Sequence, residues 1–235
     1  MIKYKLLSII LYIIFLPTFV FSSIFLIIVG LIHLPLFYKI DKFLCRIILL
    51  TLCSWPKILG KFPDKGTYII MMKHSSFIDV FLFPLIPKGA YSGVTAKGNF
   101  KIPVFSTLIK RIKAIPIDRS NRTSAISSIK QAEKILTEGI HIGILPEGTR
   151  TLNGLIGTIK KGGVHMAINT NTSIVPVGVI GAFNFKPKNR WWIVPNKITL
   201  NIGEVIDINK YKDASVNSIK EIIGDRLKQL SNEDR

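Results

Sequence analysis

Two residues have the types and the spacing of a catalytic base and the acid that orients it. His74 and Asp79 stand five positions apart in the run KHSSFID. A neutral imidazole can take a proton from a hydroxyl group, and a neighbouring carboxylate can fix its tautomer and stabilise the imidazolium that forms. A plainer interpretation stays open, because residues 76–79 also fit the S-x-x-D pattern that caps a helix. In that case Asp79 is a capping residue and His74 belongs to a turn.

The place of this pair in the chain decides whether the two side chains can meet. A strand predicted over 67–73 ends directly before His74, and a helix is predicted to begin in the turn that follows. Residues five positions apart in one helix diverge, whereas across a strand-to-helix junction they can approach. The positive end of the helix also disfavours a charged histidine. The sequence therefore predicts a neutral His74 beside Asp79.

Two more polar clusters follow predicted buried strands. DRSNR follows the strand AIPID, and PEGTR follows the strand IHIGIL. In open α/β sheets, binding groups collect in the loops that leave the C-terminal ends of strands. We therefore treat KHSSFID, DRSNR and PEGTR as the candidate binding loops.

The elements that would position these loops alternate between short apolar runs and helical patterns. Helices are predicted over 123–138, where apolar side chains recur on one face, and over 214–230. This alternation predicts an α/β domain with a mixed, largely parallel sheet flanked by helices. The predicted strands cover residues 67–73, 90–96, 114–118, 140–145, 173–180 and 197–208.

The N-terminal segment is apolar enough to enter a membrane. From Leu6 to Tyr38 there are 33 residues without Asp, Glu, Lys or Arg. One straight helix of that length would reach roughly 50 Å, against roughly 30 Å for the hydrocarbon core of a bilayer. Because proline removes a helix hydrogen bond, we expect a break at Pro17 that folds the segment into a membrane-embedded helical hairpin. A single transmembrane span is the alternative, and the length argues against a cleaved signal peptide.

Basic residues flank this segment at both ends, which places both ends on the cytoplasmic side of a bilayer. We expect a membrane protein whose active site faces the cytoplasm, such as an enzyme of a bacterial inner membrane. The expected organisation is an anchor with a basic connector over 1–58 and an α/β domain over 59–235. The flanking residues are Lys3, Lys5, Lys39, Lys42 and Arg46.

Composition limits the class of partner. The chain has 32 Lys and Arg against 14 Asp and Glu, a formal net charge of +18, so its partners should be acidic. A hydrophobic share of 48% favours anionic lipid over nucleic acid. The two cysteines, Cys45 and Cys53, lack metal-ligand spacing and are interpreted as free thiols of a reducing compartment. We expect no metal and no nucleic-acid partner.

Four blocks of the chain, which include parts of these clusters, resemble the four motifs of the glycerolipid acyltransferases and follow one another in the same order. The resemblance covers roughly residues 60–205, and PEGTR is intact, whereas Ser106 and Lys113 stand where the family commonly has glycine. Four blocks in this order are far more specific evidence for the family than any one block alone. The blocks are residues 74–79, 97–103 with 115–119, 145–150 and 174–177.

The resemblance implies a reaction and roles for its residues. His74 would deprotonate the acceptor hydroxyl, which attacks an acyl thioester without a covalent acyl-enzyme, and Asp79 would orient His74. Arg150 would bind the acceptor phosphate, a task suited to its planar guanidinium group. Glu147 would position its loop, and Gly148 would let the backbone approach an anion. The implied substrate-binding residues are Lys97, Arg119, Glu147, Gly148, Thr149 and Arg150.

The expected enzyme moves a fatty acyl group from acyl-CoA or acyl-carrier protein to the sn-2 hydroxyl of 1-acyl-sn-glycerol-3-phosphate (lysophosphatidic acid). The product would be phosphatidic acid, and no cofactor beyond the thioester co-substrate is implied. Its partners would be these two substrates, membrane lipid and acyl-carrier protein. Three alternatives remain: a related enzyme that acts on another lyso-lipid, a non-catalytic protein that binds anionic lipid, and a hydrolase that uses Ser75 or Ser76.

Other polar and aromatic residues favour structural roles. His33, His141 and His165 lie in predicted apolar elements, where packing or surface positions are more common than ligation. Trp191 and Trp192 follow three basic residues, a composition that fits either a lipid interface or an ordinary hydrophobic patch.

Overall fold

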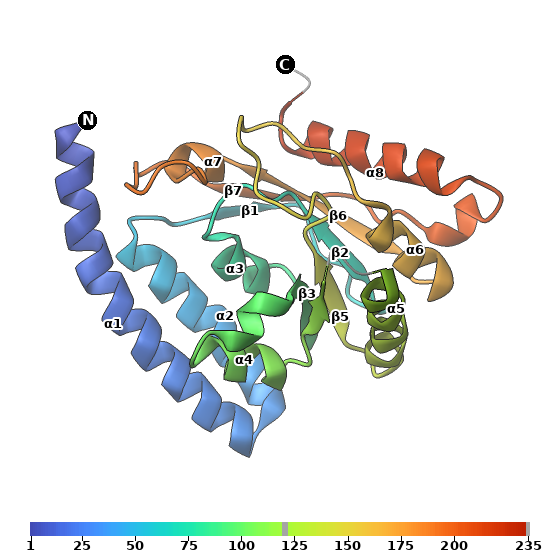
Figure 1. Ribbon diagram of the computed structural model, residues 1–235, viewed down its shortest axis with the longest axis horizontal. Coiled ribbons are helices and arrows are strands. Elements are labelled where there is room, and N and C mark those ends of the chain that lie inside the picture. Colours follow the sequence, from blue (N-terminus) through green and yellow to red (C-terminus); the bar gives the residue numbers. More distant parts are fainter. Residues whose placement is uncertain (119–121, 234–235) are drawn as a thin grey trace.

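A seven-stranded sheet forms the centre of the molecule. The computed structural model describes residues 1–118 and 122–233, and the strands lie in the order β1-β7-β6-β2-β5-β3-β4 (Figure 1). All neighbouring strands are parallel except β6 and β7, which confirms the mixed, largely parallel sheet. The strands are β1 (Lys57–Leu59), β2 (Ile69–Met72), β3 (Tyr91–Ala96), β4 (Ile115–Ile117), β5 (His141–Ile144), β6 (Ile174–Ile180) and β7 (Thr199–Ile202).

Helices cover both faces of this sheet. The longer ones are α1 (Ile2–Ile32), α2 (Leu34–Thr51), α4 (Phe105–Arg111), α5 (Arg122–Thr137), α6 (Lys161–Asn169) and α8 (Val216–Leu230). The short ones are α3 (Asp79–Leu82), α7 (Ala182–Phe185) and the 3-10 turns η1 (Phe83–Leu85), η2 (Lys97–Lys101) and η3 (Ile208–Tyr211). Every predicted strand contains an observed one, whereas β1 arises in a segment that we had expected to be a connector.

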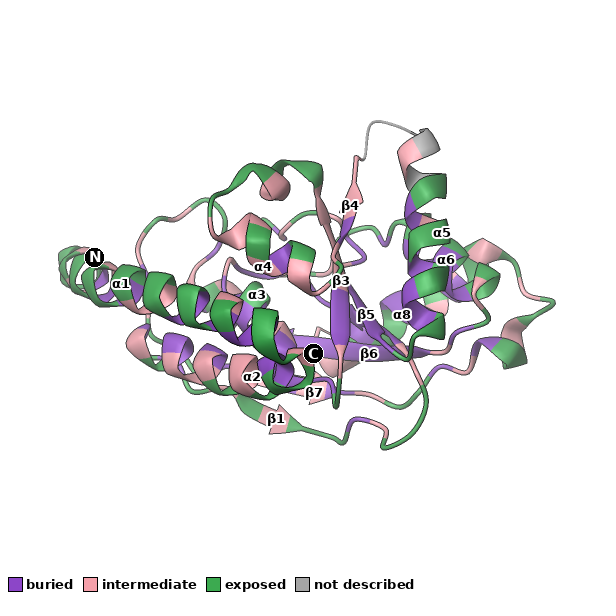
Figure 2. Ribbon diagram, turned by 90° about the horizontal axis from the view of Figure 1, so that it is seen from below, coloured by how far each residue is buried: buried purple, intermediate pink, exposed green. Residues whose placement is uncertain are grey.

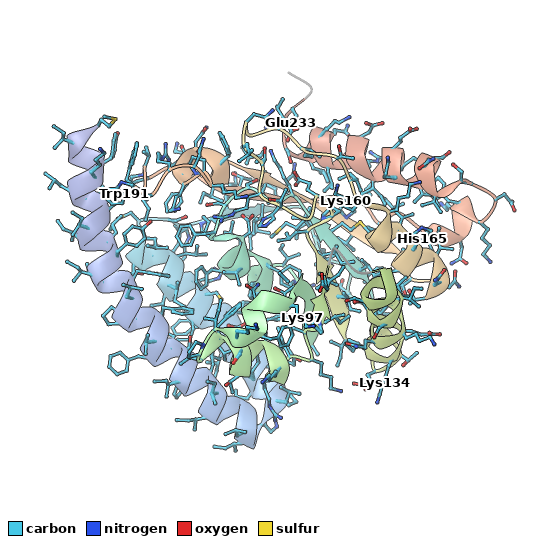
Figure 3. All side chains as sticks on the ribbon, viewed as in Figure 1. Lys97, Lys134, Lys160, His165, Trp191 and Glu233 are labelled. Carbon is cyan, nitrogen blue, oxygen red and sulfur yellow. The ribbon has the colours of Figure 1, made fainter. Side chains whose placement is uncertain are left out.

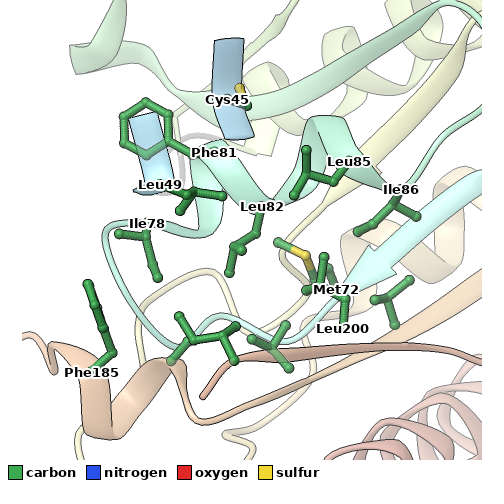
Figure 4. Packing of buried hydrophobic residues seen from close by; sticks show 14 of the residues in the cluster. Cys45, Leu49, Met72, Ile78, Phe81, Leu82, Leu85, Ile86, Phe185 and Leu200 are labelled. Carbon is green, nitrogen blue, oxygen red and sulfur yellow. The ribbon is translucent and has the colours of Figure 1, made fainter. Parts of the chain in front are cut away.

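Strand β2 shows why the sheet needs helices on both sides. Its four residues are all fully buried, and they alternate between two hydrophobic clusters. The neighbouring strands β5 and β6 are likewise buried (Figure 2). Ile70 and Met72 pack with α2 and α3, as the close view in Figure 4 shows for Met72. Ile69 and Met71 pack with α5, α6 and α8. An apolar strand without a polar face is typical of such a doubly covered position.

The N-terminal segment forms a helical hairpin, but not at the predicted place. α1 runs through Pro17 without a break, and the chain turns at His33, whose backbone is extended with φ −149° and ψ 97°. The His33 ring nitrogen Nδ1 accepts a hydrogen bond of 3.1 Å from the amide of Leu36 and so caps α2. Pro35 lies in the first turn of α2, where its missing amide hydrogen costs nothing.

The expected break at Pro17 is therefore wrong, and packing explains why. A proline inside a helix costs about 3 kcal/mol. Here Leu11 and Phe15 on one side of it and Leu26 on the other are buried in hydrophobic clusters. Because these contacts hold both halves of α1 along the same body, they outweigh the local cost of the proline.

The outer surface of α1 favours membrane association. Among the described residues α1 alone is long and apolar enough to cross a bilayer. Its buried positions include Ser8, Ser22 and Ser23, whereas large apolar side chains such as Ile13 and Phe21 are exposed. Small residues inside and large apolar residues outside are typical of a helix whose outer face meets lipid.

The hairpin also shares its core with the sheet domain. Ser8 on α1 accepts a hydrogen bond of 2.7 Å from the amide of Ile193, and the hydroxyl of Tyr12 donates to the carbonyl of Trp191 at 2.7 Å. On α2, Leu49 is fully buried against the helices of the first cluster. The two parts therefore share one core. The predicted division of the chain at residue 58 stays a prediction.

This shared core predicts how two adjacent leucines of α2 differ. Replacing Leu49 (0% exposed) by alanine removes buried methylene groups and leaves a cavity, so we expect a loss of about 2–5 kcal/mol in the free energy of unfolding. The matched change Leu50→Ala, at a side chain that is 57% exposed, should cost about 0.5 kcal/mol or less. Denaturant unfolding of the detergent-solubilised protein measures both, and equal losses would show that α2 does not belong to the folded core.

Candidate active site

The turn between β2 and α3 brings His74 and Asp79 together. The imidazole Nδ1 of His74 lies 2.8 Å from the carboxylate Oδ2 of Asp79. The Asp79 side chain is 1% exposed, whereas that of His74 is 20% exposed. Of these two side chains, only the His74 ring reaches the surface. The predicted meeting of the two side chains across a strand-to-helix junction is thus what the structure shows.

Ile78, not Asp79, stands at the N-cap of α3, so the capping interpretation is wrong, but Asp79 does organise the turn. Its Oδ2 accepts hydrogen bonds from the amides of Ser75 at 2.7 Å and Ser76 at 2.9 Å. The Ser76 hydroxyl does not cap the helix, because it donates to the carbonyl of Lys186 at 2.7 Å. With Nδ1–H donating to Asp79, the other ring nitrogen, Nε2, carries the lone pair that a general base needs.

Glu147 ties the PEGTR loop to this turn. It is buried, its Oε1 accepts from the amide of His74 at 2.7 Å, and its Oε2 accepts from the amide of Gly157 at 2.8 Å. Burial raises the pKa of the Glu147 carboxyl, and these two amides oppose that rise. The amide of Thr151 adds a bond of 3.0 Å to the carbonyl of His74. The loop after β5 is therefore fixed to the residue that carries the candidate base.

Three residues of the PEGTR loop, Glu147, Thr149 and Arg150, line an open cavity of about 470 Å³. Gly148 has a φ of +74°, a conformation that glycine adopts at no steric cost. Arg150 is half-buried and Thr149 is exposed. His74 is not among the lining residues, which include Glu147, Thr149, Arg150, Leu152, Leu155 and Lys160.

A lysine that the sequence analysis did not single out belongs to this region. Lys186 follows α7, and its backbone carbonyl accepts the hydrogen bond that the Ser76 hydroxyl donates. Its ammonium group lies 5.1 Å from the centre of the Phe77 ring. Burial lowers the pKa of Lys186, and the positive charges of Arg150 and Arg190 lower it further. Within residues 1–118 and 122–233, neither Lys186 nor Arg150 forms an ion pair with a carboxylate. Such a cluster of uncompensated cations suits a bound anion.

Two other predicted binding residues stay untested. Lys97, labelled in Figure 3, is exposed at the start of η2, and its side chain forms no hydrogen bond or ion pair with any described residue. Arg119 lies outside the described residues. No group of three His, Cys, Asp or Glu side chains that could hold a metal ion occurs in the described part of the chain.

The remaining histidines have structural or surface positions. His141 is enclosed by aromatic rings, and its Nδ1 accepts from the amide of Tyr68 at 3.1 Å. Burial lowers the pKa of His141, which favours its uncharged form. His165 is exposed on α6. Neither lies in the cluster around His74.

The sequence is similar to those of known proteins. A family model described as Acyltransferase matches residues 57–180. The 1-acyl-sn-glycerol-3-phosphate acyltransferase of Cocos nucifera is 33% identical over 157 residues, which make up 66% of this chain and 51% of that protein. The protein of the same name from Borreliella burgdorferi is 29% identical over 165 residues, or 70% of this chain and 66% of that protein. This chain thus spans between half and two thirds of the length of these two relatives.

A solved structure shares the fold. The crystal structure of the 1-acyl-sn-glycerophosphate (LPA) acyltransferase PlsC from Thermotoga maritima matches with a TM-score of 0.83 and 22% identity. The match covers 97% of this chain and 94% of that one, so it includes the helical hairpin as well as the sheet.

Proposed function

Because this chain belongs to the acyltransferase family, we propose that it transfers a fatty acyl group from a thioester to the sn-2 hydroxyl of 1-acyl-sn-glycerol-3-phosphate. The product is phosphatidic acid, an intermediate of phospholipid synthesis. The observation that carries this proposal is the 2.8 Å contact between His74 Nδ1 and Asp79 Oδ2, which leaves Nε2 to act as a base. The names of the matching relatives support the choice of acceptor.

The proposed reaction needs one proton relay. Nε2 of His74 takes the proton of the acceptor hydroxyl as its oxygen attacks the thioester carbonyl. The carbon–sulfur bond then breaks, and the imidazolium returns the proton to the thiolate. Asp79 stabilises the imidazolium while it lasts. No cofactor is needed beyond the thioester, which is acyl-CoA or acyl-carrier protein.

The cations near this pair support a phosphate-bearing acceptor. Arg150 and Lys186 are close enough to affect one another electrostatically, and both lack a carboxylate partner among the described residues. A guanidinium group can bind two phosphate oxygens at once, which fixes the acceptor relative to the base.

The serine alternative finds no support in the geometry. Ser75 and Ser76 are both fully buried, and the Ser76 hydroxyl is bonded to the Lys186 carbonyl. A nucleophile must reach its substrate, and neither hydroxyl does so here.

We place this activity at the cytoplasmic face of a membrane, such as a bacterial inner membrane. The lipid-facing side of α1 would lie in the bilayer, where the acceptor and the product also reside. Lys3 and Lys5 at the start of α1 and three basic residues on α2 would meet anionic head groups. This position would give the enzyme access to lipid substrates and to a soluble thioester.

The first test combines product identification with removal of the base. Purified protein with labelled acyl-CoA or acyl-carrier protein and a panel of lyso-lipids should yield phosphatidic acid, identified by mass. His74→Ala should lower turnover by roughly 10²- to 10⁴-fold, because a positioned base contributes that much. His165→Ala removes an exposed imidazole and should leave turnover unchanged. Retained activity in His74→Ala would refute the role of His74.

The second test addresses the acceptor phosphate. Arg150→Ala should weaken acceptor binding by about 1.5–3 kcal/mol, or roughly 10- to 100-fold in KM, because a charge-assisted hydrogen bond is lost. Arg226→Ala, which removes an exposed guanidinium from α8, serves as the control. Steady-state kinetics with each substrate varied in turn separates the two sites. A raised donor KM with an unchanged acceptor KM would assign Arg150 to the donor site instead.

A further inference from the structure

The residue before His74 is a buried lysine. Lys73 follows β2 directly, and its side chain is 4% exposed. Lysine is almost never buried unless its charge is paired. Its ammonium group donates to the carbonyl of Gly154 at 2.5 Å and to Oε1 of Glu233 at 2.5 Å. The burial of Lys73 therefore depends on a carboxylate that lies 160 positions later in the chain.

Glu233 reaches this place from the segment that follows α8. Its side chain is 9% exposed, and Figure 3 labels it above the end of that helix. Its second oxygen, Oε2, accepts from the amide of Ile156 at 2.7 Å. Both oxygens of this carboxylate are thus engaged, one by the end of β2 and one by the loop after PEGTR.

Glu233 and Glu147 hold the same loop in parallel ways. Glu147 joins the amide of His74 to the amide of Gly157, and Glu233 joins the ammonium group of Lys73 to the amide of Ile156. Two consecutive residues at the end of β2 are therefore linked through two carboxylates to two consecutive amides of the loop. A chance surface ion pair would be exposed and would not contact loop backbone at both ends.

We propose that Glu233 is a positioning residue of the transfer reaction. It holds the segment 151–157, and with it Arg150, against the strand end that carries His74. Because Arg150 precedes this segment directly, a looser segment would let the phosphate-binding group move relative to the base. A misplacement of that kind weakens catalysis without the loss of any group that touches substrate. The kinetic part of this proposal rests on the proposed function.

The first arm of the test needs no substrate. Glu233→Gln in the full-length protein keeps the length of the side chain but removes the charge that pairs with Lys73. Hydrogen exchange of peptides from residues 151–158 should accelerate by roughly 10-fold or more, the order expected when bonds to a charged group weaken. Exchange within α8 should stay unchanged. The control is Asp225→Asn, which removes an equal charge from a side chain that is 74% exposed on α8, and it should leave both regions as they are.

The second arm separates positioning from a general loss of stability. Glu233→Gln should raise the acceptor KM by roughly 10-fold with little change in the donor KM, since it acts through Arg150. In an Arg150→Ala background the same change should add almost nothing to the acceptor KM. Fully additive effects, or equal rises in both KM values, would overturn the proposal.

A paired variant covers the case in which Glu233→Gln does not fold. Lys73→Met with Glu233→Gln leaves no unpaired buried charge, yet it weakens the links to Gly154 and Ile156. The exchange of residues 151–158 should still accelerate, and unchanged exchange would refute the contact. A wild-type protein that transfers no acyl group would refute the proposed function, whereas the loop contact would still be judged by exchange.

Discussion

The hydrogen bond from His74 Nδ1 to Asp79 Oδ2 is the interaction on which the rest of the site depends. A free histidine at the surface would change tautomer and orientation, and neither ring nitrogen would be reserved for a substrate. Asp79 is itself held by the amides of Ser75 and Ser76, so the carboxylate cannot turn away. The same oxygen therefore fixes the backbone of the turn and the direction of the ring, which makes the base a property of the β2–α3 junction.

The scaffold around this junction holds the loop of Arg150 and the helical hairpin in place relative to it. β2 lies at the middle of the sheet, buried on both faces, and gives the turn a rigid starting point. Two carboxylates, Glu147 and Glu233, then fasten the loop of Arg150 to the end of the same strand. The hairpin of α1 and α2 packs into the first hydrophobic cluster, so the exposed apolar surface of α1 and the turn that holds the candidate base share one core.

Much of this could be predicted because it depends on local pattern. Apolar runs gave the strands, and the H-x4-D spacing at a strand end gave the pair of His74 and Asp79. Lys113, where the family commonly has glycine, has a φ of +55° at the end of α4, which explains that preference. The break at Pro17 failed because tertiary contacts outweighed a local rule. The roles of Lys186 and Glu233 could not be predicted, because only the fold brings them to Ser76 and Lys73, which lie 110 and 160 positions earlier in the chain.

The central claim is that Asp79 fixes the tautomer of the His74 ring, with the proton on Nδ1 and the lone pair on Nε2. Nitrogen-15 NMR of histidine-labelled full-length protein in detergent, at a pH above neutrality, observes this directly. His74 is assigned by the signal lost in His74→Ala. The account predicts a protonated Nδ1 and an unprotonated Nε2 for His74, and a loss of that preference in Asp79→Asn. A proton on Nε2 in the wild-type protein, or a tautomer unaffected by Asp79→Asn, would contradict it.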